Sequence, residues 1–177
     1  IPFSFLLFYK KIEKKYYNNV IAIGALLVAQ AFIGWYMVRS GLSERVDVSQ
    51  YRLALHLTMA FIILGLTFYT LVSYLIENNL INKKSVFIKK YKSLLIIIFI
   101  FICFQISYGA FVSGTHAGLL YNTWPFYNGN ILPYIENTQI RWIINLFENG
   151  EYIIFIHRTF AMLILFFLFY LNYLILM

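Results

Sequence analysis

Long apolar stretches alternate with short polar ones along the whole chain. Four of these stretches, residues 20–38, 53–76, 94–112 and 152–177, are long enough to cross a bilayer as helices, which takes about 20 residues. Backbone polar groups have no water to bind in lipid, so a segment that crosses alone has to be helical. The pattern therefore predicts an all-α fold, a polytopic transmembrane helix bundle.

The basic residues orient these helices. Cytoplasmic loops of membrane proteins carry an excess of Lys and Arg, and most of the fourteen in this chain fall in two clusters. We therefore place residues 10–19 and 77–92 inside, and residues 39–52 and 114–151 outside. The clusters comprise Lys10, Lys11, Lys14 and Lys15, then Lys83, Lys84, Lys89, Lys90 and Lys92.

The composition agrees with this topology and argues against a soluble domain or a nucleic-acid-binding protein. The chain is 62% hydrophobic and only 12% charged, whereas soluble domains are nearer one quarter charged. Topology alone explains the formal charge of +7, so no nucleic-acid partner is expected. Cys103 is the single cysteine, which excludes an intrachain disulfide. Residues 1–9 are apolar but too short to span, so we expect a fragment of a longer protein that begins at the tail of a helix.

Two histidines are the strongest candidates for chemistry. His56 and His157 each lie about one turn inside an apolar stretch, on the same predicted side of the membrane. An ionisable residue at this depth is a functional candidate, and histidine is a common ligand of haem iron. Ala60 and Ala161, four residues further on, leave room for a flat macrocycle beside each ring. We predict that His56 and His157 bind metal; the alternative is a packing role or an interhelical hydrogen bond.

Other polar residues have weaker claims. Arg52 and Arg158 are predicted to pair with haem propionates, and the alternative is that they snorkel at the membrane border. His116 is interpreted as a loop histidine. Interhelical hydrogen bonds are expected of the polar residues at membrane depth, which are Gln30, Gln105 and Ser107. No general acid or base is expected inside the bundle, because the acidic residues Glu44, Asp47, Glu136, Glu148 and Glu151 fall in outer loops or at helix ends.

The outer segment, residues 114–151, is rich in aromatic residues. An interfacial aromatic belt explains this composition slightly better than a lid over a cofactor pocket, and both remain open. Gly114 and Gly118 form a pair of small residues four apart, which allows close helix packing or simply marks a turn.

Several short motifs, in this order and spacing, resemble the haem A synthase family of mitochondria and alphaproteobacteria. They cover nearly the whole chain. The matching stretches are Gly34-Trp35-Tyr36-Met37-Val38, Ser40-Gly41-Leu42, Val48-Ser49-Gln50-Tyr51-Arg52-Leu53-Ala54 with His56, Gly109-Ala110-Phe111-Val112, Ala117-Gly118-Leu119-Leu120-Tyr121-Asn122-Thr123-Trp124-Pro125, Asn145-Leu146-Phe147-Glu148-Asn149 and His157-Arg158.

The resemblance implies eight transmembrane helices in two related four-helix halves, each with a haem site. Residues 1–80 then end the N-terminal half, with the tail of helix two and helices three and four. Residues 81–92 form a basic cytoplasmic linker, and residues 93–177 begin the C-terminal half with helices five and six. His56 and His157 would serve different haems, which amends the simplest guess of one site with two histidines. The family's acidic residue and the other ligands are expected before Ile1 and beyond Met177.

The resemblance also implies an activity. The family oxidises the C8 methyl of haem O to a formyl group, and so makes haem A for cytochrome oxidase. His56 would bind the substrate haem O and His157 a cofactor haem B, in a bacterial cytoplasmic or mitochondrial inner membrane. Haem O synthase is an expected partner, a homo-oligomer is compatible with the sequence, and the isolated 177 residues are expected to be inactive. The alternatives are a b-type electron-transfer cytochrome and a non-enzymatic assembly, structural or transport protein.

Overall fold

The computed structural model describes residues 13–41, 48–80, 85–127, 129–133 and 142–177. It contains four long helices: α2 (Lys14–Gly41), α3 (Gln50–Glu77), α4 (Ser85–Gly114) and α7 (Gly150–Leu176). Each is long and apolar enough to cross a membrane. The described residues contain no strand, apart from one isolated bridge between Tyr127 and Asn130. The prediction of an all-α polytopic membrane protein is confirmed.

The long helices extend beyond the apolar stretches that predicted them. α4, for example, begins at Ser85, inside the segment expected to be a basic linker, and α2 begins at Lys14. Hydropathy marks only the part of a helix that lies in hydrocarbon. Lysine is itself a good helix former, so the helix continues into the aqueous boundary.

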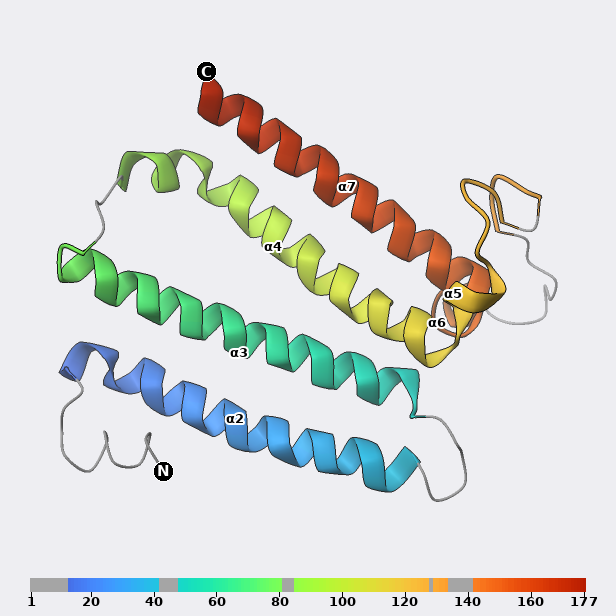
Figure 1. The fold of residues 1–177 in the computed structure, drawn as a ribbon, viewed down its shortest axis with the longest axis horizontal. Coiled ribbons are helices and arrows are strands. Elements are labelled where there is room, and N and C mark those ends of the chain that lie inside the picture. Colours follow the sequence, from blue (N-terminus) through green and yellow to red (C-terminus); the bar gives the residue numbers. More distant parts are fainter. Residues whose placement is uncertain (1–12, 42–47, 81–84, 128, 134–141) are drawn as a thin grey trace.

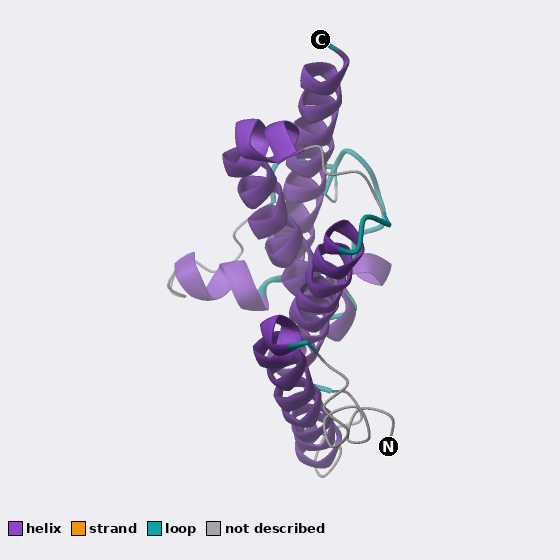
Figure 2. Ribbon diagram, turned by 90° about the vertical axis from the view of Figure 1, so that its left-hand side faces the viewer, coloured by secondary structure: helices purple, strands orange, loops and turns teal. Residues whose placement is uncertain are grey.

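The four long helices form an antiparallel row. α2 packs against α3, α3 against α4, and α4 against α7 (Figure 1). Figure 2 shows the row from the side at which α7 ends, with the C-terminus at the top. Many large apolar side chains face away from the row, as expected of helices that span a membrane.

One end of the row, which we call the outer end, contains the buried core. Ala54 of α3 packs there with Tyr108, Ala110 and Phe111 of α4 and Ile153 of α7. Two short helices, α5 (Ala117–Leu120) and α6 (Trp142–Glu148), lie at the same end. The sequence pattern did not predict them, because a helix of one or two turns has too few residues to show a period.

Polar contacts join α3 to α6 at the outer end. The Gln50 amide donates to Glu148 over 3.1 Å, and the Tyr51 hydroxyl donates to the same carboxylate. Gly114 of α4 is close by: a Cβ there would lie 2.7 Å from the Cα of Gln50. This close backbone approach is the first of the two roles considered for Gly114. α7 begins directly after α6. α3 and α7 therefore begin at the same end of the row, as the topology prediction required.

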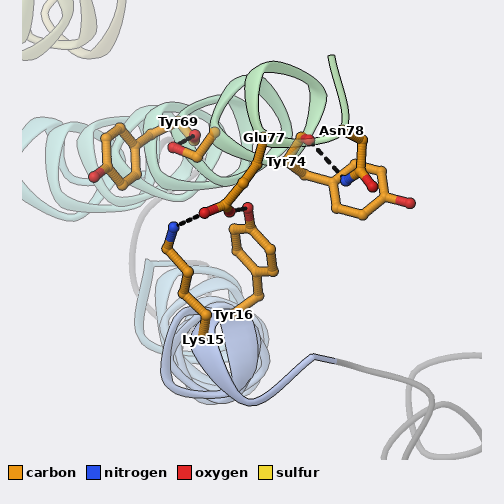
Figure 3. Close-up of polar contacts among 7 residues, drawn as sticks. Lys15, Tyr16, Tyr69, Tyr74, Glu77 and Asn78 are labelled. Atoms are coloured by element: carbon orange, nitrogen blue, oxygen red, sulfur yellow. Dashed lines mark hydrogen bonds and ion pairs between the residues drawn. The ribbon is translucent and has the colours of Figure 1, made fainter. Parts of the chain in front are cut away.

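At the opposite, inner end, each pair of helices is closed by a tyrosine from its first helix. Tyr16 of α2 donates to Glu77 of α3, which also forms an ion pair with Lys15 (Figure 3). Tyr91 of α4 donates to the carbonyl of Leu174 on α7 over 2.9 Å. Both tyrosines are buried. We refer below to the α2–α3 pair and the α4–α7 pair as the two hairpins.

Candidate functional site

His56 lies on α3, about 9 Å along the helix axis from its first residue. Its ring lies against α2, where the Gln30 amide nitrogen is 3.3 Å from Nε2 and 3.0 Å from the His56 carbonyl oxygen. Gly34, one turn further along α2, makes room for the ring. A Cβ at this position would lie 3.0 Å from His56 Cε1, so any larger residue would push the imidazole away.

His157 repeats this arrangement on the second hairpin. It lies about 10 Å along α7 from its first residue, so the depth matches that of His56. Its ring lies against α4, with the Gln105 amide nitrogen 3.2 Å from Nε2. A Cβ at Gly109 would lie 3.3 Å from His157 Cε1.

The first helices of the two hairpins share a pattern that sequence reasoning missed. Tyr, Gln and Gly stand at identical intervals in α2 and α4: Tyr16, Gln30 and Gly34, then Tyr91, Gln105 and Gly109. The expectation that Gln30, Gln105 and Ser107 bond between helices is confirmed, with Ser107 2.9 Å from Thr58. The sequence carried the repeat but did not reveal that the partners of the two glutamines are the candidate histidines.

Each site contains buried polar atoms without a partner among the described residues. They are Nδ1 of both histidines and Oε1 of both glutamines. Leaving such an atom unsatisfied costs about 1–3 kcal/mol, so a buried network with open positions points to a further group that completes it. Ala60 and Ala161 are exposed, so the described residues leave the helix surface beside each histidine uncovered. A half-buried imidazole with uncovered helix surface beside it fits a haem ligand.

The two arginines lie on the outer side of the histidines, in different surroundings. The Arg52 guanidinium lies over the Tyr36 ring, 4.8 Å from its centroid. Arg158 donates to the carbonyls of Tyr121 and Thr123 over 2.9 and 2.8 Å, and lies 5.2 Å from the centroid of Tyr127. Arg158 therefore ties the outer segment to α7. A guanidinium has five N–H donors, so both arginines keep donors for a carboxylate.

The aromatic residues of the outer segment divide into two groups. Tyr127 is buried and packs against Phe155 of α7, and Phe147 packs against Tyr108 and Phe111 of α4. The other group faces outward, as in an aromatic belt, and includes Trp124, Phe126 and Trp142. The outward-facing group fits the aromatic belt, and the inward-facing group fixes the described part of the segment to the helices. The Trp124–Pro125 peptide bond is cis.

The remaining candidate residues lie away from His56 and His157. His116 is exposed in the turn between α4 and α5, as expected of a loop histidine. Glu148 and Glu151 lie at the outer end, and Glu44, Asp47 and Glu136 lie outside the described residues. Within the described ranges, no three His, Cys, Asp or Glu side chains gather closely enough to hold a metal ion. A haem needs only one or two protein ligands.

The fold and the two sites define a class: a polytopic helical membrane protein with histidine sites at matching depth in two adjacent hairpins. Sequence comparison gives the particular family. The chain belongs to the cytochrome oxidase assembly protein family (COX15-CtaA), whose family model matches residues 1–177.

Relatives of this chain carry the name heme A synthase. The protein from Wolbachia pipientis subsp. Culex pipiens (strain wPip) is 43% identical over 169 residues, which cover 93% of this chain and 49% of the relative. The protein from Pelagibacter ubique (strain HTCC1062) is 41% identical over 174 residues, which cover 98% of this chain and 50% of the relative. The chain thus spans about half the length of these relatives. No solved structure matches it.

Proposed function

We propose that this chain is the central part of a haem A synthase, which oxidises the C8 methyl of haem O to a formyl group. The observation that carries the proposal is the repeated site, in which a half-buried imidazole at matching depth packs against a glutamine and a glycine of the preceding long helix. The named relatives supply the reaction, and the histidines fit the group that the reaction needs.

In this proposal His56 binds the iron of the substrate haem O and His157 the iron of a resident haem B. Their contacts support separate sites, because His56 lies against α2 and His157 against α4. Bound haem supplies the redox chemistry, and the residues of this chain bind and orient it. Arg52 and Arg158 pair with propionates by charge-assisted hydrogen bonds. The two hairpins belong to different four-helix halves.

A direct experiment produces the complete gene product in membranes of a host that makes haem O, extracts the pigments and separates haems B, O and A. We expect haem A in the extract, together with protein-bound haem B. A protein that binds haem B but forms no haem A would be a b-type cytochrome. Purified protein without Soret absorption would support a structural or assembly role and reject the proposal.

A further inference from the structure

The two glutamines, Gln30 and Gln105, have no assigned role beyond joining helices. We propose that they are positioning residues that set the tautomer of His56 and His157. Each holds the ring proton on Nδ1 and thereby leaves Nε2 as the nitrogen able to bind iron. The part that concerns iron rests on the proposed function, whereas the part that concerns the tautomer does not.

The orientation of the Gln30 amide follows from the His56 carbonyl. A carbonyl oxygen only accepts hydrogen bonds, so the Gln30 atom 3.0 Å away has to be the NH2 group. The same nitrogen lies 3.3 Å from His56 Nε2, and an NH2 group can only donate in this contact. Nε2 is therefore an acceptor. A neutral imidazole has one donor and one acceptor nitrogen, so the proton resides on Nδ1, which has no acceptor among the described residues.

The second site supports the same polarity by repetition. The Gln105 amide nitrogen is 3.2 Å from His157 Nε2, and Gly109 follows Gln105 at the interval that separates Gly34 from Gln30. In both hairpins the glycine lets the ring approach the first helix closely enough for this contact. At both sites, therefore, a glutamine and a glycine hold the histidine so that its Nε2 faces the amide nitrogen.

This arrangement prepares each ring for a metal. Nε2 has a single lone pair, so the glutamine has to release it when that nitrogen binds iron. Gln30 then keeps its bond to the His56 carbonyl and remains in place beside the ring. Until that point the amide occupies the lone pair of Nε2.

The tautomer is measured on haem-free complete gene product carrying ¹³C,¹⁵N-histidine in lipid bilayers, by solid-state NMR. We expect the Nδ1–H tautomer at both histidines. In Gln30→Glu the carboxylate only accepts, so we expect the proton of His56 to move to Nε2 while His157 stays unchanged as an internal control. An Nε2–H tautomer at His56 in the unaltered protein would overturn the proposal.

Haem binding gives a second readout. In a His157→Ala background, titration with haem B reports the His56 site. We expect Gln30→Glu to weaken binding by about tenfold or more and Gln30→Met by about threefold, because only the carboxylate holds a proton on Nε2. A merely structural glutamine predicts the reverse order, since Glu keeps an interhelical hydrogen bond and Met loses it. That reverse order would refute the inference, whereas absence of haem from the unaltered protein would refute only the proposed function.

Discussion

The His56 and His157 sites share the contacts of their rings and differ in the contacts that the described residues make on their outer side. Both have a ring against a glutamine and a glycine of the preceding long helix. At the His157 site, Arg158 bonds to two carbonyls of the outer segment and Tyr127 packs against α7. At the His56 site, Arg52 lies over the ring of Tyr36, a residue of the helix that already carries Gln30.

This difference suggests a division of labour. Two sites with the same ring environment are expected to bind the same kind of group. A site with an outer segment bonded beside it is expected to retain its ligand, and among the described residues this arrangement is seen at His157. The comparison agrees with a resident haem at His157 and a substrate haem at His56, as proposed above.

The largest effects are expected from removing the histidines. His157→Ala in the complete gene product is expected to lower bound haem B by about tenfold or more, because the ring is the proposed iron ligand. His56→Ala is expected to lower haem A formation to a similar extent and to leave haem B bound. Pigment extraction and absorption spectra measure both. His116→Ala is the control, and loss of the same haem in all three variants would remove the distinction between the sites.

Adding a methyl group at Gly34 or Gly109 tests the contact between glycine and histidine ring that the two sites share. Gly34→Ala and Gly109→Ala place a Cβ 3.0 and 3.3 Å from the histidine rings, and both are expected to lower haem binding at their own site, Gly34→Ala more strongly. We expect about 1–3 kcal/mol of lost binding at Gly34. Haem titration measures the loss. Gly65→Ala is a matched control, because its Cβ would meet Phe99 at an ordinary 3.7 Å. Equal effects at Gly65 would show that the ring contact is irrelevant.

Substitutions of Arg158 and Arg52 test whether the two sites differ in their contacts with the outer segment. Arg158→Ala removes two hydrogen bonds to the outer segment and is expected to loosen it by about 1–2 kcal/mol. Limited proteolysis of the outer segment should become faster. Arg52→Ala, which loses a ring contact, should leave the cleavage rate unchanged. If both variants are cleaved alike, the outer segment does not distinguish the sites.

The smallest effects are expected at the inner ends. Tyr16→Phe and Tyr91→Phe each remove one hydroxyl that closes a hairpin, at a cost of about 0.5–1.5 kcal/mol. Thermal unfolding should shift by a few degrees, with haem content unchanged. A large loss of haem in either variant would mean that the inner ends, and not only the glutamines and glycines, position the rings.

The sequence predicted the helices and the depth of the histidines, because both depend on position along one segment. Long apolar stretches gave the four spanning helices, and the lysine clusters gave the shared outer side of His56 and His157. The presence of Gln30 and Gln105 at membrane depth was also visible, and their interhelical role followed from the cost of an unpaired amide there.

The partners of these residues were not predictable in the same way. Which ring Gln30 meets depends on how α2 and α3 rotate about their axes, and hydropathy does not fix that rotation in helices apolar on most sides. The carbonyls that Arg158 binds depend on the path of an irregular segment. The repeat of Tyr, Gln and Gly is present in the sequence. Only the structure shows that the glycine of each repeat lies against a histidine ring.

Gly114 has a consequence for the geometry of the whole assembly. It ends the helix that carries Gly109, and a Cβ there would lie 2.7 Å from the Cα of Gln50, at the start of the helix that carries His56. The two hairpins thus meet main chain to main chain. Even a single carbon inserted at this point would act as a wedge and tilt one hairpin away from the other. The separation of His56 and His157 therefore depends on a hydrogen atom at Gly114, a position where every other amino acid would place a side-chain carbon.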